Sequence, residues 1–272
     1  MKPLSIFSAA ISLVPFRFIR SGIIKLKTGI LHTSYSILTA NILFCVITLN
    51  LDAQTISTDE LSKVNKELLK ANSLAIDMIY TVYAGHSTQQ PLQIEKGIYL
   101  RKGDKFYSKL LGIETLISEG YFVLVYSEDQ TMVIGPSDKI NSGNTTPVDI
   151  QKSLSMCNKI EEIKSGKNQK AYKIFYKSTV ASEYDAAEIY YNKTNYIIEK
   201  MVLYYRSPMR LTTDSNLSSE MPRLEIEYTA INTSPSLKDR DFSTQNFFDK
   251  KGSGYTPALK YKNYRIINKK NT

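Results

Sequence analysis

The sequence predicts an α+β protein that is mainly β, with about ten to eleven antiparallel strands and a few short helices. Short alternating apolar runs follow one another along most of the chain, separated by only a few turn-forming residues. Links this short allow only up-and-down antiparallel neighbours, because a parallel pair needs a long crossover connection. The chain also holds 19 Tyr and no Trp, and Tyr favours strands.

The first 54 residues have the pattern of an export leader. An apolar stretch runs from Ser36 to Leu51 and ends at Asp52-Ala53-Gln54, and the region before it is basic without an acid. This order is typical of a secretory signal peptide. The stretch contains Thr and Asn and is shorter than the roughly 20 residues of a spanning helix, which favours a signal peptide that is removed. The alternative is a signal anchor that is retained. Because the basic region is unusually long, we expect the true translation start to lie downstream of Met1. The alternative is two membrane-directed segments, since residues 1–19 are themselves apolar.

A first helix is expected directly after the leader. Ser57 and Glu60 have the spacing of a capping box. Apolar residues then recur at helical spacing up to Asn72-Ser73, where the pattern ends. The apolar face of this helix consists of Leu61, Val64, Leu68 and Ala71. A helix with one such face is expected to pack on a sheet.

Two groups of strands follow this helix, with a short second helix from Thr146 to Met156 between them. The strands of the first group are expected at residues 78–83, 94–101, 106–111, 114–118, 121–126 and 131–134. The strands of the second group are expected at residues 171–178, 187–192, 196–205 and 224–231. Asn192 to Asn195 has the composition of a hairpin turn, and the polar segment from Ser207 to Pro222 is expected to be a long loop.

The charge is concentrated at the two ends of the chain. Residues 1–54 carry five basic groups and one acid, and residues 249–272 carry seven basic groups and one acid. The 194 residues between them carry 23 basic and 24 acidic groups. A nucleic-acid-binding domain would place a basic face on its folded body, so no nucleic-acid partner is expected. The sequence therefore predicts one domain over residues 55–248, followed by a basic C-terminal tail over residues 249–272 with a possible last strand at residues 261–267.

Residues that could carry catalysis are scarce. After removal of the leader, His86 and Cys157 are the remaining His and Cys, too few for a Cys/His zinc site. Glu225 and Glu227 lie on one face of a strand, but apolar residues alternate with them, which indicates a solvated face. The sequence therefore predicts a protein that is not an enzyme, with no catalytic residue, no metal and no cofactor.

The order of the elements and several local motifs resemble a known family. The motifs are a strand–turn–strand unit, a glycine hairpin, a late hairpin, and a closing strand with an aromatic exit: Lys96–Phe106, Ile117–Tyr126, Glu188–Lys200, and Arg223–Asn232 followed by Phe242 and Phe247. Together they resemble the outer-membrane lipoprotein carriers (LolA-like) of the lipoprotein-sorting superfamily, over roughly residues 55–248. The resemblance implies an open antiparallel half-barrel with helices on or near its concave face. The family usually carries an Arg-Pro pair in the first turn, where this chain has Lys102-Gly103, so the arginine that latches the family's lid is missing at that position.

The resemblance implies a periplasmic carrier that holds the acyl chains of a lipid or lipoprotein in an apolar cavity. The alternative is a non-enzymatic envelope scaffold on the same fold, with a filled cavity and envelope proteins as partners. The expected location is the periplasm, or the membrane surface if the leader is retained.

Strand alternation suggests which side chains line the cavity. Arg101, as a charged residue, is expected to point outward, which places Ile98 and Leu100 on the concave face. The larger apolar side chains of the strand at 121–126 are expected to join them. The expected lipid-binding residues are Ile98, Leu100, Phe122, Leu124 and Tyr126, covered by the helix face of Leu61, Val64 and Leu68.

We expect cleavage of the leader after Ala53 or Gln54, because the apolar stretch stops at Leu51 and the first helix begins near Ser57. N-terminal sequencing of the protein isolated from its native envelope measures the mature start. A mature start before Ile37 would contradict cleavage at this site and would indicate a retained anchor.

Overall fold

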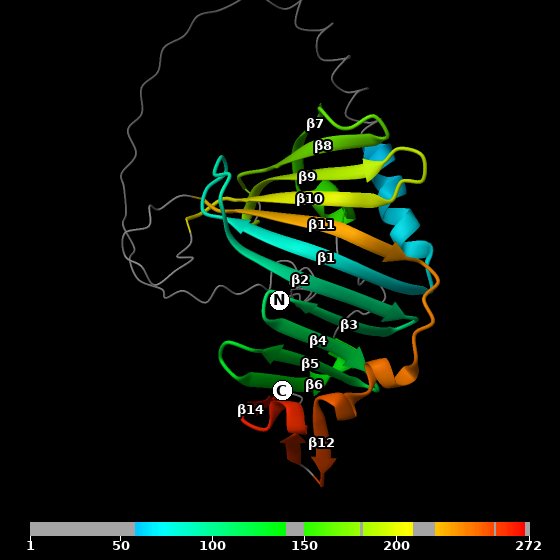
Figure 1. Cartoon of the computed structure of the whole chain (residues 1–272), viewed down its shortest axis with the longest axis vertical. Helices are drawn as coiled ribbons and strands as arrows, with labels where there is room; N and C mark the ends of the chain where they lie inside the picture. The colour runs from blue at the N-terminus through cyan, green and yellow to red at the C-terminus, as the bar shows by residue number, and fades with distance from the viewer. Residues whose placement is uncertain (1–57, 140–149, 180–181, 209–220, 253, 270–272) are drawn as a thin grey trace, which may run out of the picture.

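One large open sheet dominates the protein (Figure 1). The computed structural model describes residues 58–139, 150–179, 182–208, 221–252 and 254–269. Its twelve-stranded sheet has the order β14-β6-β5-β4-β3-β2-β1-β11-β10-β9-β8-β7. All neighbouring strands are antiparallel except β14 and β6, which are parallel. The sheet does not close into a barrel, so the predicted mainly β, open antiparallel fold is confirmed, with one strand more than expected.

The strands form two consecutive meanders. The first contains β1 (Ser73–Tyr83), β2 (Pro91–Lys102), β3 (Lys105–Leu110), β4 (Ile113–Ser118), β5 (Tyr121–Tyr126) and β6 (Thr131–Pro136). The second contains β7 (Cys157–Ile163), β8 (Gln169–Tyr176), β9 (Tyr184–Asn192), β10 (Ile198–Tyr205) and β11 (Arg223–Asn232). Ten of these strands overlap the predicted ones. The strand of these meanders that the sequence analysis missed is β7, which lies at the edge of the sheet and contains the charged residues Lys159, Glu161 and Glu162.

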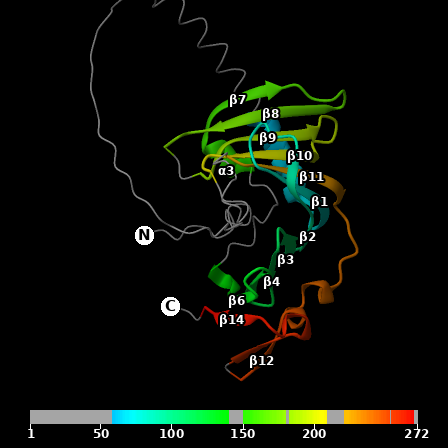
Figure 2. The same ribbon diagram turned by 60° about the vertical axis from the view of Figure 1, so that its left-hand side comes forward.

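The two meanders are joined by the pairing of β1 with β11 (Figure 2). These strands are the first of one meander and the last of the other, so their pairing brings together residues about 150 positions apart, such as Ile76 and Ile231. Tight turns with left-handed glycines, such as Gly103 (φ +60°) and Gly120 (φ +79°), link the strands of the first meander. The resulting sheet is curved, as Figure 2 shows from the side.

In the part of the chain that the structure describes, two α-helices accompany the sheet. The N-terminal helix covers residues 58–70, and its Leu61, Val64 and Leu68 are at most 1% exposed within the main hydrophobic cluster. The short helix α3 (Ile150–Ser155) lies between the meanders. The leader, Ser57, the start of the second predicted helix and most of the predicted loop at residues 207–222 lie outside the described residues.

The C-terminal segment, which is the described chain after β11, is folded. This corrects the expectation of a basic tail over residues 249–272. After β11, the chain forms short 3₁₀ turns, the hairpin of β12 (Phe248–Lys251) and β13 (Gly254–Pro257), and finally β14 (Arg265–Asn268). A last strand was predicted at residues 261–267, and the strand found there begins four residues later, at Arg265. The 3₁₀ turns are η3 (Asp239–Phe242), η4 (Thr244–Asn246) and η5 (Leu259–Tyr261), with η1 (Ser137–Lys139) earlier in the chain.

This segment covers one face of the first meander. Its Phe242, Phe247, Phe248 and Tyr261 form a second hydrophobic cluster with side chains of β4, β5 and β6. Strands covered on both faces are expected to be almost continuously apolar, and β5 and β6 have this pattern. Strand β4 is also buried along most of its length, but it includes the polar residues Glu114, Thr115 and Ser118. We call this covered side the outer face and the opposite side, on which the N-terminal helix lies, the helix-side face.

We expect Phe242→Ala to lower the free energy of unfolding by about 3–5 kcal/mol, because Phe242 is fully buried in the outer cluster. Urea denaturation measures this change. Leu259→Ala in the same segment is the control: its side chain is 86% exposed, so the change should stay within about 0.5 kcal/mol. Equal, small effects of both substitutions would show that the segment does not stabilise the sheet.

Candidate functional site

Strand pairing determines which side chains share the helix-side face, because directly paired residues of antiparallel strands point to the same side. Arg101 pairs with Phe106, Phe106 with Ile117, and Ile117 with Phe122. All four side chains are at most 5% exposed. Arg101 hydrogen-bonds the N-terminal helix, which identifies the side on which this row of residues lies.

This register corrects the predicted positions of Ile98 and Leu100. Leu100 pairs with Tyr107 and packs against the outer cluster, and Ile98 lies two residues away on the same outer face. The prediction failed because it assumed that Arg101 must face solvent. Its guanidinium is instead buried against backbone carbonyls, which compensate the desolvation of the charge.

Three of the five predicted residues do share the helix-side face: Phe122, Leu124 and Tyr126. The strand pairing adds a larger apolar and aromatic set from β1 to β6 that the sequence analysis missed. It consists of Met78, Tyr80, Val82, Tyr99, Phe106, Ile117 and Val133. The sequence signal for this set was the row of large apolar residues at every second position of β1: Leu74, Ile76, Met78, Tyr80 and Val82. All five side chains are buried.

Two glycines allow aromatic rings to lie across neighbouring strands of this face. A Cβ atom at Gly97 would come within 2.3 Å of the Tyr80 ring, and one at Gly135 within 2.3 Å of the Phe122 ring. Glycine in a strand often marks such a close approach. The rings of Tyr80 and Phe122 thus extend the apolar surface from one strand to the next.

The N-terminal end of the helix is fixed to the second meander through Glu60. Its carboxylate accepts hydrogen bonds from the hydroxyls of Tyr172 (2.5 Å) and Tyr191 (2.9 Å) and lies 2.6 Å from the Lys170 Nζ. Burial alone would raise the pKa of Glu60, but the hydrogen bonds from Lys170, Tyr172 and Tyr191 outweigh it, so its pKa lies below the ordinary 4.5. A carboxylate in the first turn is also favoured by the helix dipole.

The C-terminal end of the helix is fixed to the first meander through Arg101. Its Nη2 donates to the carbonyl oxygens of Leu68 (2.9 Å) and Ala71 (2.7 Å). Carbonyls of the last helical turn have no partner within the helix, and a cation there is favoured by the helix dipole. The helix therefore bridges both meanders, even though Lys102-Gly103 replaces the Arg-Pro pair of the resembling family.

Two buried polar atoms near this helix have no hydrogen-bond partner within the described part of the chain. They are the Oδ1 of Asn65, on the helix, and the hydroxyl of Tyr228, on β11. Tyr228 pairs with Met78 and so lies on the helix-side face, where burial raises its pKa well above the ordinary value. An unsatisfied buried polar group costs about 1–3 kcal/mol. A ligand with a polar group could satisfy these atoms.

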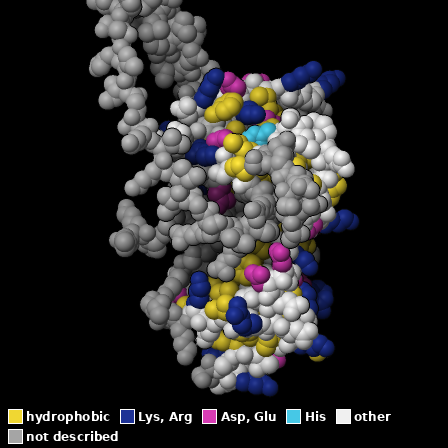
Figure 3. Space-filling model, turned by 90° about the vertical axis from the view of Figure 1, so that its left-hand side faces the viewer, with side chains coloured by type: hydrophobic (Ala, Val, Ile, Leu, Met, Phe, Trp, Pro, Cys, Tyr) yellow, Lys and Arg dark blue, Asp and Glu magenta, His cyan; other side chains and the backbone are white. Residues whose placement is uncertain are grey.

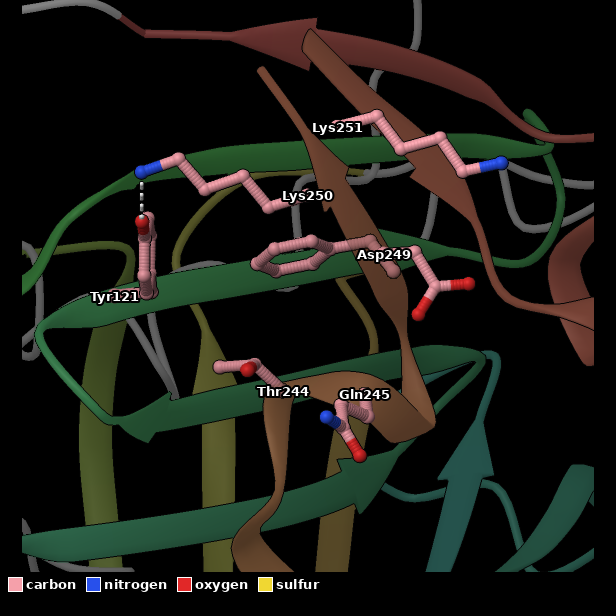
Figure 4. A pocket seen from close by; sticks show the side chains of 7 residues that line it. Tyr121, Thr244, Gln245, Asp249, Lys250 and Lys251 are labelled. Carbon is pink, nitrogen blue, oxygen red and sulfur yellow. Dashed lines mark hydrogen bonds between the residues drawn. The ribbon is translucent and has the colours of Figure 1, made fainter. Parts of the chain in front are cut away.

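A separate pocket of about 430 Å³ lies on the outer side, between β5 and the C-terminal hairpin (Figure 4). Its walls are mostly polar, and Lys250 donates to the Tyr121 hydroxyl at 3.1 Å. The lining residues are Tyr121, Thr244, Gln245, Phe248, Asp249, Lys250 and Lys251. Because Tyr121 pairs with Pro136 on the outer face, this pocket is distinct from the helix-side face.

Groups that could support catalysis remain scattered. His86 lies against the Tyr204 ring, with its Nε2 3.0 Å from the Tyr205 carbonyl oxygen, and Cys157 is a buried thiol on β7. Within the described ranges, no three His, Cys, Asp or Glu side chains are arranged to hold a metal ion. None of the helices described in those ranges has the length and apolar character needed to cross a bilayer.

Comparison with known proteins gives structural likenesses at low similarity. No family model matches the chain. No curated protein sequence matches it either. Similar solved structures include a LolA superfamily protein from Nitrosomonas europaea (10% identity, 68% of this chain and 96% of that chain, TM-score 0.30). Others are a putative outer membrane lipoprotein-sorting protein domain from Vibrio parahaemolyticus (10%, 69% and 96%, 0.32) and an uncharacterised conserved protein from Thermus thermophilus (10%, 78% and 99%, 0.40).

The superfamily that the sequence resembles is thus among the similar structures. All three TM-scores are below 0.5. The fold is therefore described from the strand pairing of this chain, and its function is argued from its own side chains.

The Glu60 contacts predict a pH-dependent stability. Because the pKa of Glu60 is lowered in the folded protein, its stabilising contribution is present above about pH 4.5 and is lost as pH falls through the folded pKa. We expect the free energy of unfolding to fall more steeply with acidification in the wild type than in Glu60→Gln, as measured by urea denaturation at a series of pH values. The exposed Glu128→Gln is the control and should keep the wild-type slope. Identical slopes for all three proteins would contradict this role of Glu60.

Proposed function

We propose that this protein is a non-enzymatic carrier that binds the acyl chains of a lipid or lipoprotein on its helix-side face. The observation that supports this proposal is the continuous apolar and aromatic surface that β1 to β6 present on the helix-side face. The helix is held at its two ends by polar contacts, to β8 and β9 through Glu60 and to β2 through Arg101, and its buried Leu61, Val64 and Leu68 add to the same hydrophobic cluster.

The physical basis of binding would be the burial of methylene groups. Each buried methylene contributes about 0.8 kcal/mol, so a long acyl chain along this face could supply several kcal/mol. Leu124 and Tyr126 are only half-buried on β5 and offer the accessible part of the surface. The unpartnered Tyr228 hydroxyl and Asn65 Oδ1 offer hydrogen bonds to an ester, amide or hydroxyl group of the ligand.

The proposed setting is the bacterial periplasm, reached through the leader, with envelope proteins as further partners. The resemblance to the lipoprotein carriers agrees with this setting. No cofactor or metal is part of the proposal.

A scaffold on the same fold is the second candidate. It is favoured by the deep burial of Phe106, Ile117 and Phe122, each at most 5% exposed, since a filled face would leave no room for a ligand. In that case the protein would act through its surface and bind other envelope proteins.

We expect Leu124→Glu to weaken binding of a fluorescent fatty acid at least about tenfold, because a carboxylate buried beside an acyl chain has no compensating partner. Leu100→Glu is the matched control: Leu100 is also half-buried, but it lies on the outer face, so its binding should equal that of the wild type. A displacement assay with unlabelled fatty acid measures both.

Circular dichroism and urea denaturation establish that both variants are folded. Native mass spectrometry of the purified protein adds an independent readout, since a carrier should retain copurified lipid. Absence of any fatty-acid binding by the folded wild type would reject the carrier and support the scaffold. Equal weakening by both substitutions would reject the assignment to the helix-side face.

A further inference from the structure

The C-terminal segment combines strong positive charge with an exposed apolar side chain. Residues 248–269 carry six basic groups and one acid. Lys250, Lys251, Lys262 and Arg265 are exposed, and Leu259 between them in sequence is 86% exposed. Among the described residues, Leu259 is the most exposed large hydrophobic side chain. Figure 3 shows Lys and Arg side chains around the lower end of the molecule, with hydrophobic side chains among them.

Most of these positive charges form no ion pair with the residues that the structure describes. In this segment Lys260 forms an ion pair, with Glu114 at 3.1 Å, and this pair anchors the segment to β4. The Lys250 ammonium donates to the neutral Tyr121 hydroxyl rather than to a carboxylate. The rest of the folded domain carries almost no net charge, so the basic groups are concentrated at this end.

The segment is also rigidly placed. Its aromatic residues are buried in the outer cluster, and β14 pairs with β6 from Arg265 to Asn268. Leu259 begins η5, whose Tyr261 is 2% exposed and hydrogen-bonded to Glu114. The folded turn therefore holds the Leu259 side chain in an exposed position next to that of Lys262, three residues later.

We infer that this end of the molecule docks, through Leu259 and the exposed basic side chains around it in the C-terminal segment, on a bilayer that contains anionic lipid. Basic side chains near such a bilayer are attracted to its negative surface potential, and an apolar side chain can enter the interface. Nucleic acid would also attract the lysines but would not favour an exposed leucine, so the observations favour a membrane. This end lies at the β14 edge of the sheet, far in strand order from the Glu60 contacts at β8 and β9. Docking would bring the β5–β6 end of the helix-side face to the membrane.

Vesicle binding of the full protein tests this inference. Flotation with vesicles of phosphatidylcholine alone, and with phosphatidylglycerol in equal parts, measures the preference for anionic lipid. The triple variant Lys250→Gln, Lys251→Gln, Lys262→Gln should lose about fivefold in binding to the anionic vesicles for each lysine removed. The control has the same change of charge at the opposite edge, with Lys164, Lys167 and Lys193 changed to Gln, and should bind like the wild type.

Insertion of Leu259 has its own readout. Leu259→Ser should reduce binding to anionic vesicles about tenfold or more while the charge stays constant. Leu259→Trp introduces a single tryptophan into a chain that has none, and its emission should shift to shorter wavelength with anionic vesicles. Leu92→Trp, on β2, should show no shift.

The outcomes separate this inference from the proposed carrier function. The carrier test measures displacement of a fatty acid, whereas this test measures flotation of the wild type and the lysine variants with vesicles, so a failure of acyl binding leaves this prediction in place. Equal vesicle binding by the wild type and the triple variant would overturn the inference. Unchanged emission of Leu259→Trp would overturn it as well, and tight binding of duplex DNA that is insensitive to Leu259→Ser would indicate a nucleic-acid surface instead.

Discussion

The pairing of β1 with β11 is the constraint on which the rest of this structure depends. Each meander can form from neighbouring segments alone, but only this pair of strands makes them one sheet. The pairing extends from Tyr83 with Arg223 to Ala75 with Asn232, interrupted by one irregularity after Asp77. Because it fixes the register between the meanders, it also decides which side chains of both are brought under one helix. The apolar face of β1 then continues without a break into both halves of the sheet.

The N-terminal helix strengthens this junction. Glu60 binds Tyr172 and Tyr191 of the second meander, and Arg101 of the first meander binds the last carbonyls of the helix. Opposite charges are thus placed at the two helix ends where the dipole favours them. On the other side of the sheet, the C-terminal segment is held by Glu114, which accepts hydrogen bonds from Tyr107 and Tyr261. Polar contacts therefore position the covering elements, while apolar contacts fill the space beneath them.

Much of the fold could be predicted from the sequence, because ten strands have clear alternation and short turns. The edge strand β7 could not, since Lys159, Glu161 and Glu162 give it the composition of a solvated loop. The hairpin of β12 and β13 was not predicted either, because the segment that contains it is held by Phe242, Phe247 and Phe248 packing on a distant face, which no local pattern reveals. Of the five strand residues predicted to bind lipid, Phe122, Leu124 and Tyr126 lie on the helix-side face, whereas Ile98 and Leu100 lie on the outer face. Arg101 misled the assignment of β2 because its partners are backbone carbonyls from another element.

The late position of the C-terminal segment in the sequence has a consequence for the folding of the newly synthesised chain. Strands β4 to β6 carry Leu116, Val123, Val125, Met132 and Ile134 toward a covering segment that begins roughly a hundred residues later in the chain. During synthesis, this apolar face is therefore complete long before the segment that covers it has been made. Such a partly assembled sheet is prone to self-association. A helper protein that shields exposed apolar strands would be needed in that interval, and chains that end before Phe242 would keep needing it.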